Sequence, residues 1–341
     1  KMEAISAFED GVWELPDGAV CSAMHMVTRP SDHRAFLRDG TPAPVRSVVD
    51  LTKSQVNAHL PRWAFRMPGP DDAVAMLGKY PNAWLGTTDL SKFYPSLGLG
   101  PSLQSVCWIK DPRSDTTWRG TGPKSAAWIA FHAKRKAEGI RYPPYRRCSG
   151  VALGLKVAPA FACGISGEIV QFLTAIGITS TMYVDDLLIA ASTREQCAED
   201  MATAVSVFEW LGLRCNPDKQ VGPARRLKYL GLIIDVDLKT VSIDDDRRLD
   251  LRRELLRFQE SASFGTKDLE TLIGKLSFAS CVVKGGQAFT YRLRVCLRTA
   301  LDNSSATVKV DDAARADATW WADKLATSVG GSSIFLADTD L

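Results

Sequence analysis

Apolar residues occur along this chain in short runs, and the clearest runs flank two adjacent acids. Residues 181–190 have the sequence TMYVDDLLIA, in which apolar and partly β-branched side chains lie on both sides of Asp185 and Asp186. This pattern predicts a buried strand, a turn with the two acids at its tip, and a second buried strand. Two carboxylates placed in this way repel each other, so the pair either binds a divalent cation or faces water as an ordinary solvated turn.

Hydrophobic periodicity predicts further strands and helices on both sides of this hairpin. Strands are expected at 24–28, 44–51, 84–90 and 213–219, with more strand structure at 227–234; helices are expected at 71–80, 125–138, 159–177, 192–211 and 246–300. Ser192 and Glu195 match a capping box at the start of one helix, and Gly212 follows its end. The order strand, helix, hairpin, helix, strand over 84–234 predicts an antiparallel sheet with helices on one face, of the split βαβ type.

A third acid, Asp89, lies at the end of the apolar strand 84–90, where a carboxylate needs a partner. In a split βαβ sheet this strand is the expected neighbour of the hairpin, which brings Asp89 to Asp185 and Asp186. Three close carboxylates require cations, and oxygen ligands without His or Cys nearby select Mg²⁺ or Mn²⁺. Two such ions about 4 Å apart activate a hydroxyl and stabilise a leaving pyrophosphate. The predicted chemistry is therefore nucleotidyl transfer.

The composition of the chain indicates which class of protein it is, but the small net charge does not indicate which partner it binds. The 341 residues are 45% apolar and 24% charged, enough for a large core in two domains or one multi-lobed domain, and the net charge is only +3. Eight cysteines without a CxxC pair argue against a zinc module and a disulfide framework, and predict a reducing intracellular compartment, cytoplasm or nucleus. Neither a membrane-length apolar run nor a signal peptide is present, so no membrane partner is expected.

Positive charge is concentrated in one segment, residues 134–147. Six Lys or Arg residues there oppose the single acid Glu138, with Tyr142 and Tyr145 between them. Cations interleaved with aromatic rings suit a nucleic-acid backbone and its bases, although a solvated charged helix end is the alternative. The candidate phosphate contacts are Lys134, Arg135, Arg146 and Arg147.

Arg46 shares a predicted strand face with Val48 and Asp50. This face is either the solvated edge of a sheet, or Arg46 points at an anion.

Five motifs together resemble reverse transcriptases in their order and spacing. They are Asp89 with Tyr94 five positions on, the LGLKVAP loop at 153–159, YVDD at 183–186, Lys219, and YLG at 229–231. The resemblance covers residues 20–325. It implies an α+β fold of the right-hand polymerase type, with fingers, palm and thumb, a split βαβ antiparallel palm sheet and a helical thumb. The implied boundaries are fingers 1–83, palm 84–109, an extended basic fingers insertion 110–149, palm with the primer grip 150–243, thumb 244–303, and a connection 304–341.

The family resemblance also implies a role for each matching residue. Asp89, Asp185 and Asp186 correspond to the catalytic metal ligands, with Asp186 the weaker third, and Lys219 to a lysine that protonates the leaving pyrophosphate, unless it is a plain surface lysine. The incoming dNTP is expected to contact Arg46, Tyr94, Leu153 and Gly154. Tyr94 leaves no room for a ribose 2′-hydroxyl, which argues against viral RNA-dependent RNA polymerases. Further nucleic-acid contacts are expected at Tyr183, Tyr229, Leu230, Gly231 and Lys275.

The implied activity is that of an RNA-directed DNA polymerase, which extends a primer on an RNA or DNA template with dNTPs and two Mg²⁺, or Mn²⁺ in their place. Three segments are similar to DIRS-type, tyrosine-recombinase retrotransposons, namely 272–276, 285–289 and 314–321. Two alternatives are a scaffold that binds nucleic acid without polymerising, and a domesticated or protein-primed polymerase of the same fold. At 334–341, where an RNase H domain would begin in the family, the sequence ends, so no RNase H function is assigned.

Overall fold

The computed structural model describes residues 14, 20–28, 45–80, 82–110, 126–327 and 332–333. The chain forms two units, each assembled from segments distant in sequence. The first comprises Lys1–Met67, Leu90–Ser166 and Glu209–Arg214; the second comprises Pro68–Asp89, Gly167–Phe208 and Cys215–Leu341. Because both units are discontinuous, the chain crosses between them several times. Residues 334–341, where an RNase H domain would begin in the family, lie outside the described residues.

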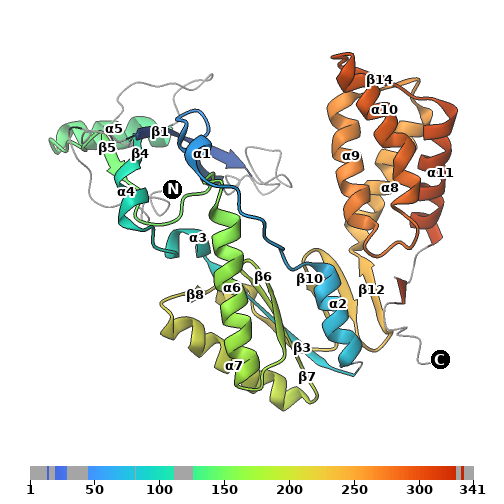
Figure 1. Ribbon diagram of the computed structural model, residues 1–341, viewed down its shortest axis with the longest axis horizontal. Coiled ribbons are helices and arrows are strands. Elements are labelled where there is room, and N and C mark those ends of the chain that lie inside the picture. The colour runs from blue at the N-terminus through green and yellow to red at the C-terminus, as the bar shows by residue number, and fades with distance from the viewer. Residues whose placement is uncertain are drawn as a thin grey trace. The chain divides into compact units, whose positions relative to one another are not determined.

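The first unit contains a four-stranded sheet in the order β2-β1-β4-β5 (Figure 1). Its strands are β1 (Val20–Thr28), β2 (Val45–Asp50), β4 (Cys107–Lys110) and β5 (Tyr145–Arg147), and its helices are α1 (Val56–His59), α3 (Phe93–Ser96), α4 (Pro101–Val106) and α5 (Ala126–Ala137). β1 is antiparallel to β2 and parallel to β4. The strands predicted at 24–28 and 44–51 and the helix at 125–138 are confirmed. Short β4 and β5 were not predicted, because three or four residues carry too little periodicity.

The central sheet has the order β6-β7-β3-β8, with β9 also paired to β3. Its strands are β3 (Trp84–Ser91), β6 (Ser180–Tyr183), β7 (Asp186–Ala191), β8 (Arg214–Cys215) and β9 (Val221–Ala224); the accompanying helices are α2 (Pro70–Lys79), α6 (Ala158–Ala175) and α7 (Arg194–Trp210). β3 pairs antiparallel with β7, and β7 with β6, which confirms the predicted antiparallel sheet. The strand predicted at 213–219 is only β8, followed by the 3₁₀ turn η2 (Pro217–Lys219).

Side chains on the two faces of β3 pack against different neighbours. Leu85 is fully buried in one core with Ala73 and Leu77 of α2. The next residue, Gly86, faces α7, where an added Cβ would lie 2.3 Å from the Met201 sulfur. Successive residues of a strand point to opposite faces, so helices cover both faces of the sheet. The prediction of helices on one face was wrong, because β3 is apolar on both of its faces and each face needs a cover.

The start of α7 differs from the predicted capping box. The helix begins at Arg194, and the Thr193 hydroxyl accepts a hydrogen bond of 3.1 Å from the Gln196 backbone N–H. The N-cap is therefore Thr193, and the assignment of Ser192 with Glu195 was wrong by one residue. A hydroxyl can satisfy the amide three positions on only from the residue just before the first helical turn, which here is Thr193.

The rest of the second unit is a small sheet and a helical bundle (Figure 1). The sheet runs β10-β11-β12-β15, formed by Arg226–Tyr229, Leu232–Asp235, Thr240–Ile243 and Ser332–Ser333; the bundle contains α8 (Asp245–Glu260), α9 (Thr266–Ala279), η3 (Ala288–Thr290), α10 (Tyr291–Asp302) and α11 (Asp312–Thr327), with β13 (Ser263–Gly265) and β14 (Thr307–Lys309) paired beside them. Helix α11, within the predicted connection 304–341, shares the bundle core through fully buried Trp321.

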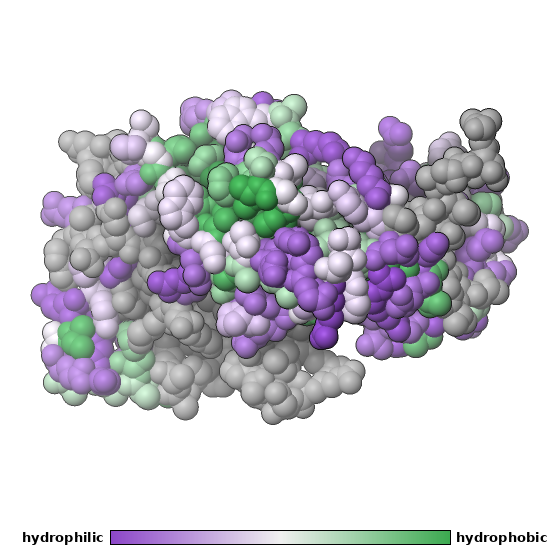
Figure 2. Space-filling view, turned by 90° about the horizontal axis from the view of Figure 1, so that it is seen from below, coloured by the Kyte–Doolittle hydropathy of each residue, from purple (hydrophilic) through white to green (hydrophobic). Residues whose placement is uncertain are grey.

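The surface carries scattered apolar side chains. Figure 2 shows hydrophobic surface gathered in a limited patch among hydrophilic side chains on one face. The most exposed large apolar residue among those described is Trp210, at 79%. In the described part of the chain no helix has both the length and the apolar character that crossing a bilayer requires.

Candidate active site

The register of the central sheet places two of the predicted acids opposite each other. β3 and β7 pair from Trp84 with Ala191 to Asp89 with Asp186. Directly opposed residues of an antiparallel pair project to the same face, with Cβ atoms about 4.5–5.5 Å apart. The apolar positions of β3 and β7 are buried, and Asp89 itself is only 8% exposed. The hydrophobic pairing of the two strands therefore forces Asp89 and Asp186 together.

The turn of the hairpin is shifted by one residue from the predicted position. Tyr183 pairs with Asp186, so the two turn residues are Val184 and Asp185, and Asp186 is the first residue of β7. The prediction that both acids form the tip was wrong, because pairing with Tyr183 and with Asp89 keeps Asp186 in the sheet. Val184 adopts φ 56°, a left-handed conformation that costs a β-branched residue about 1–3 kcal/mol. Burial of its side chain, 5% exposed, offsets part of that strain.

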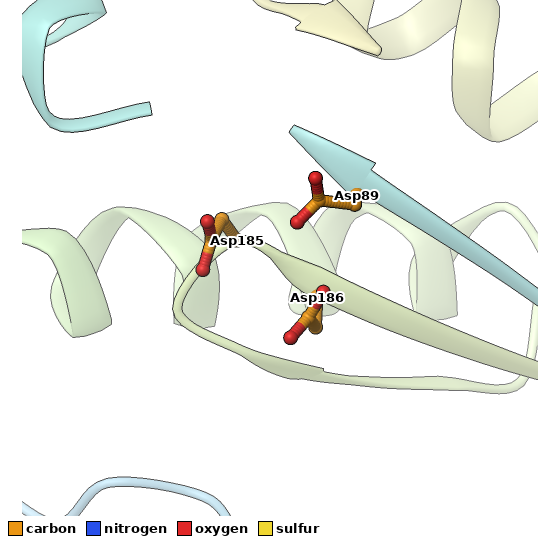
Figure 3. A group of neighbouring side chains, drawn as sticks. All are labelled: Asp89, Asp185 and Asp186. Carbon is orange, nitrogen blue, oxygen red and sulfur yellow. The ribbon is translucent and has the colours of Figure 1, made fainter. Parts of the chain in front are cut away.

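The three carboxylates converge at one end of these strands (Figure 3). One oxygen from each of Asp89, Asp185 and Asp186 lies within 4.8 Å of the others, and this is the one group of that kind among the residues the structure describes. All donors are hard oxygen atoms, which suits Mg²⁺ or Mn²⁺. The prediction that the three acids lie close together is therefore confirmed.

Burial, and after it the neighbouring carboxylates, shift one pKa in this group. Burial raises the pKa of Asp186 to about 7, helped by a hydrogen bond to Asp89 and by the charges of Asp185 and Asp89, while Lys219 lowers it. A carboxyl group whose pKa is raised in this way is partly protonated at physiological pH. Burial and close like charges produce this result when no cation lies between the carboxylates. The cluster is thus electrostatically suited to receive positive charge.

A cation of the protein already contacts the cluster, because the Lys219 ammonium forms an ion pair with Asp89 Oδ2. Lys219 ends the turn η2, whose first residue follows the cap Asn216. The Asn216 backbone N–H donates a 2.9 Å hydrogen bond to the Asp89 carbonyl, so the turn is tied to β3. The Lys219 side chain is 46% exposed, which leaves the ammonium accessible from one side. The structure therefore places the predicted Lys219 with the three acids.

The predicted Leu153 and Gly154 lie in a loop that is held against β2. The Val49 N–H donates a 2.8 Å hydrogen bond to the Leu153 carbonyl, and the Asn57 amide donates one of 2.9 Å to the Gly154 carbonyl. Asn57 also accepts a 2.9 Å hydrogen bond from the Lys156 N–H. Asn57 was not among the predicted residues, since a single polar residue in a four-residue helix carries no sequence signal.

Gly154 is required by this loop. It has φ 108°, and a Cβ there would lie 2.1 Å from the Val49 carbonyl oxygen. Gly154→Ala is expected to lower the unfolding free energy of the first unit by about 1–3 kcal/mol. Urea denaturation measures this, with Gly139→Ala as the matched control, because Gly139 has φ 64° but nothing within 4 Å of its Cβ position. Equal losses in the two variants would show that the contact with Val49 is unimportant.

Other predicted residues are placed with less detail. Arg46 lies in β2 opposite Val27, but its side chain is outside the described residues. Tyr94 is half-buried on α3, its ring edge-on to buried Phe93 with centroids 6.3 Å apart. Tyr183 is half-buried at the end of β6.

The predicted basic contacts already have partners in the fold. Lys134 pairs weakly with Glu138 at 3.8 Å, and Arg135 donates to the Ile140 carbonyl and lies over the Tyr142 ring. Lys275 forms an ion pair with Glu254 between α9 and α8. The two remaining candidates, Arg146 and Arg147, are half-buried in β5.

The YLG segment forms the turn between β10 and β11. Tyr229 pairs with Leu232, and Leu230 and Gly231 have φ 49° and 82°. Two consecutive positive φ values match a two-residue hairpin turn whose twist suits the flanking strands. Tyr229 is buried at 5% exposure, and its hydroxyl donates a 3.1 Å hydrogen bond to the Asp186 carbonyl. Its side chain therefore faces the acids.

Comparisons with solved structures identify proteins of similar fold. The chain is similar to structures of the foamy viral protease-reverse transcriptase in complex with RNA/DNA hybrid and with dsDNA, each with a TM-score of 0.61 and 15% identity. The first match covers 94% of this chain and 35% of that chain; the second covers 95% and 55%. The likeness confirms the predicted right-hand polymerase fold.

Sequence comparisons identify the family. Protein P of Duck hepatitis B virus (strain China) is 24% identical over 164 residues, which are 48% of this chain and 20% of that protein. Protein P of isolate Shanghai/DHBVQCA34 is 24% identical over 137 residues, 40% of this chain and 17% of that protein. The chain thus spans about a fifth of these curated relatives. The family model described as reverse transcriptase (RNA-dependent DNA polymerase) matches residues 42–234, more than half of the 341 residues, so the chain belongs to the reverse transcriptase family.

Proposed function

We propose that this chain is an RNA-directed DNA polymerase that extends a primer 3′-hydroxyl with dNTPs on an RNA or DNA template. The observation that carries the proposal is the convergence of Asp89, Asp185 and Asp186 within 4.8 Å, with Lys219 on Asp89, in a chain of the reverse transcriptase family. An inactive scaffold would have no need to bury like charges together, since their repulsion destabilises the fold.

Two Mg²⁺ ions are the proposed cofactors, with Mn²⁺ as a substitute. The donor set fits them, because Asp89 and Asp186 on two paired strands and Asp185 in the adjoining turn supply oxygen ligands from a rigid frame. When bound, such ions activate the attacking hydroxyl and stabilise the leaving pyrophosphate. Asp89 and Asp185 would hold them, Asp186 would be the weaker ligand, and Lys219 would donate a proton to the pyrophosphate oxygen.

The proposed partners are a template-primer duplex and dNTPs. In this proposal fingers 1–83 and 110–149 hold the nucleotide and template, palm 84–109 and 150–243 carries the acids, and thumb 244–303 holds the duplex, followed by connection 304–341. Lys134, Arg135, Arg146, Arg147 and Lys275 remain proposed phosphate contacts. The reducing intracellular compartment also stays a prediction.

A DIRS-type origin is proposed on three segments of the helical bundle. Two of them contact each other, because a Cβ on Gly286 would lie 2.5 Å from the Trp321 ring, and Phe289 stacks on Trp320 with centroids 4.0 Å apart. The two segments occur together because their side chains pack against each other. A comparison of the same two segments in other reverse transcriptases would test whether this pairing is specific to the DIRS-type subgroup.

Primer extension tests the proposed function directly. Poly-rA and poly-dA templates, each with an oligo-dT primer, are incubated with dTTP or UTP, with and without Mg²⁺. We expect extension with dTTP on poly-rA that requires Mg²⁺. Duplex binding without extension on any template would support the scaffold instead, and extension only from a protein hydroxyl would support a protein-primed polymerase.

Tyr94 is expected to exclude ribonucleotides. Tyr94→Ala removes the ring. Relief of steric overpacking is worth about 1–3 kcal/mol, which corresponds to a rise of about 5- to 150-fold in UTP use relative to dTTP. Competitive single-nucleotide incorporation measures the ratio. Tyr94→Phe, which keeps the ring, is the matched control and should retain the wild-type ratio; an unchanged ratio in Tyr94→Ala would remove Tyr94 as the gate.

A further inference from the structure

Strand β10 aims one side chain at the acid cluster from a different sheet. Along Arg226–Tyr229, exposure alternates, so that Leu227 and Tyr229 point inward while Arg226 and Lys228 face solvent. Tyr229 shares its hydrophobic core with Leu188 of β7. Its phenol hydroxyl reaches the Asp186 backbone carbonyl at 3.1 Å. A buried ring ending in a directed hydrogen bond is held in one orientation by its packing.

The hydroxyl of Tyr229 contacts the residue that follows the Val184–Asp185 turn. That residue, Asp186, pairs with Tyr183, the residue that precedes the turn. The one strained residue of this turn, Val184, lies between Tyr183 and Asp186 in the chain.

The turn that follows Tyr229 packs against the helical bundle. Gly231, in the turn after Tyr229, packs under the Arg247 guanidinium, where a Cβ would lie 2.4 Å from Nη1. Arg247 in turn lies over the Phe278 ring, 5.0 Å from its centroid. β10 is thus fixed between the helical bundle and the acid-bearing turn. A rigid neighbour of this kind can hold a strained turn in one conformation.

We propose that Tyr229 is a positioning residue whose hydroxyl holds the Val184–Asp185 turn, through the Asp186 backbone carbonyl, at the correct distance from Asp89. The inference rests on the proposed polymerase function and deepens it. It gives Tyr229 a role inside the protein rather than on the nucleic acid, whereas Leu230 and Gly231 are half-buried and stay available as primer contacts.

Tyr229→Phe tests this role because it removes the hydroxyl and keeps the ring. The matched control is Tyr80→Phe, since the Tyr80 hydroxyl accepts a 3.2 Å hydrogen bond from Thr179, just before the other end of β6. We expect Tyr229→Phe to lower kcat for dNTP incorporation by about five- to tenfold, the effect of one lost hydrogen bond. KM for primer-template should stay at the wild-type value, as should both constants in Tyr80→Phe.

A second measurement needs no polymerisation. Mn²⁺ binding to the free protein, followed by electron paramagnetic resonance, should weaken in Tyr229→Phe by a similar factor and not in Tyr80→Phe. Wild-type kcat together with wild-type Mn²⁺ affinity in Tyr229→Phe would overturn the proposal, as would a raised KM for primer-template at unchanged kcat. If the wild-type chain extends no primer, the polymerase function fails, and the Mn²⁺ titration still decides the role of Tyr229.

Discussion

Asp185→Asn is expected to abolish dNTP incorporation while the affinity for primer-template stays within about twofold of wild type. Asp185 lies in the turn beside Asp89 and Asp186, and its carboxylate is one of the three within 4.8 Å. An amide keeps the size of the side chain but removes one negative charge from the group that would hold the cations. Metal stabilisation of the transition state is worth several kcal/mol, so a loss of about a thousandfold or more is expected.

Single-turnover incorporation and a fluorescence anisotropy titration of labelled duplex measure the two effects separately. Asp218→Asn is the matched control, because Asp218 is an exposed acid next to Lys219 and is not one of the three clustered carboxylates. Asp186→Asn is expected to retain measurable activity, as the weaker ligand. Incorporation that survives in Asp185→Asn would refute the two-metal assignment.

Lys219→Ala is expected to slow incorporation by about a hundredfold or more, the range in which a positioned general acid acts. The structure gives Lys219 two conceivable contributions, because its ammonium both neutralises Asp89 and carries a transferable proton. Loss of neutralisation alone would chiefly change how tightly cations bind. Loss of the proton donor would lower the rate even at saturating Mg²⁺. Single-turnover rates measured across a range of Mg²⁺ concentrations separate the two effects.

Lys219→Arg distinguishes these contributions further. Arginine keeps the positive charge and can pair with Asp89, but it does not release a proton in proteins. If Lys219 is the acid, Lys219→Arg should be nearly as slow as Lys219→Ala while dNTP affinity is kept. A wild-type rate in Lys219→Arg would reduce Lys219 to a counter-charge.

Much of the site could be predicted because it depends on local pattern. The apolar runs around Asp89 and around Asp185 and Asp186 can form only buried strands, and the order of elements between them leaves few topologies. Once those strands pair, their acids must meet at one end. Errors arose where a choice of one residue was decided by neighbours distant in sequence.

The turn at Val184 shows why such choices are not encoded locally. Turn propensity favours Asp over Val at a tip, yet the pairing of Asp186 with Asp89 moves the turn back onto Val184. The N-cap moved from Ser192 to Thr193 in the same way, since either hydroxyl satisfies the sequence pattern. The ion pair of Lys275 with Glu254 likewise forms only where two helices meet.

The sequence by itself determined the family, the sheet that carries the acids, and the identity of those acids, because strand periodicity and motif order are properties of the chain alone. Only the tertiary structure decided which backbone atoms surround them. It placed the Tyr229 hydroxyl on Asp186 and the Lys219 ammonium on Asp89, both from segments more than 40 positions away in the chain. Hydrogen bonds and ion pairs over such distances form only when packing brings their partners together, and no local pattern records that event.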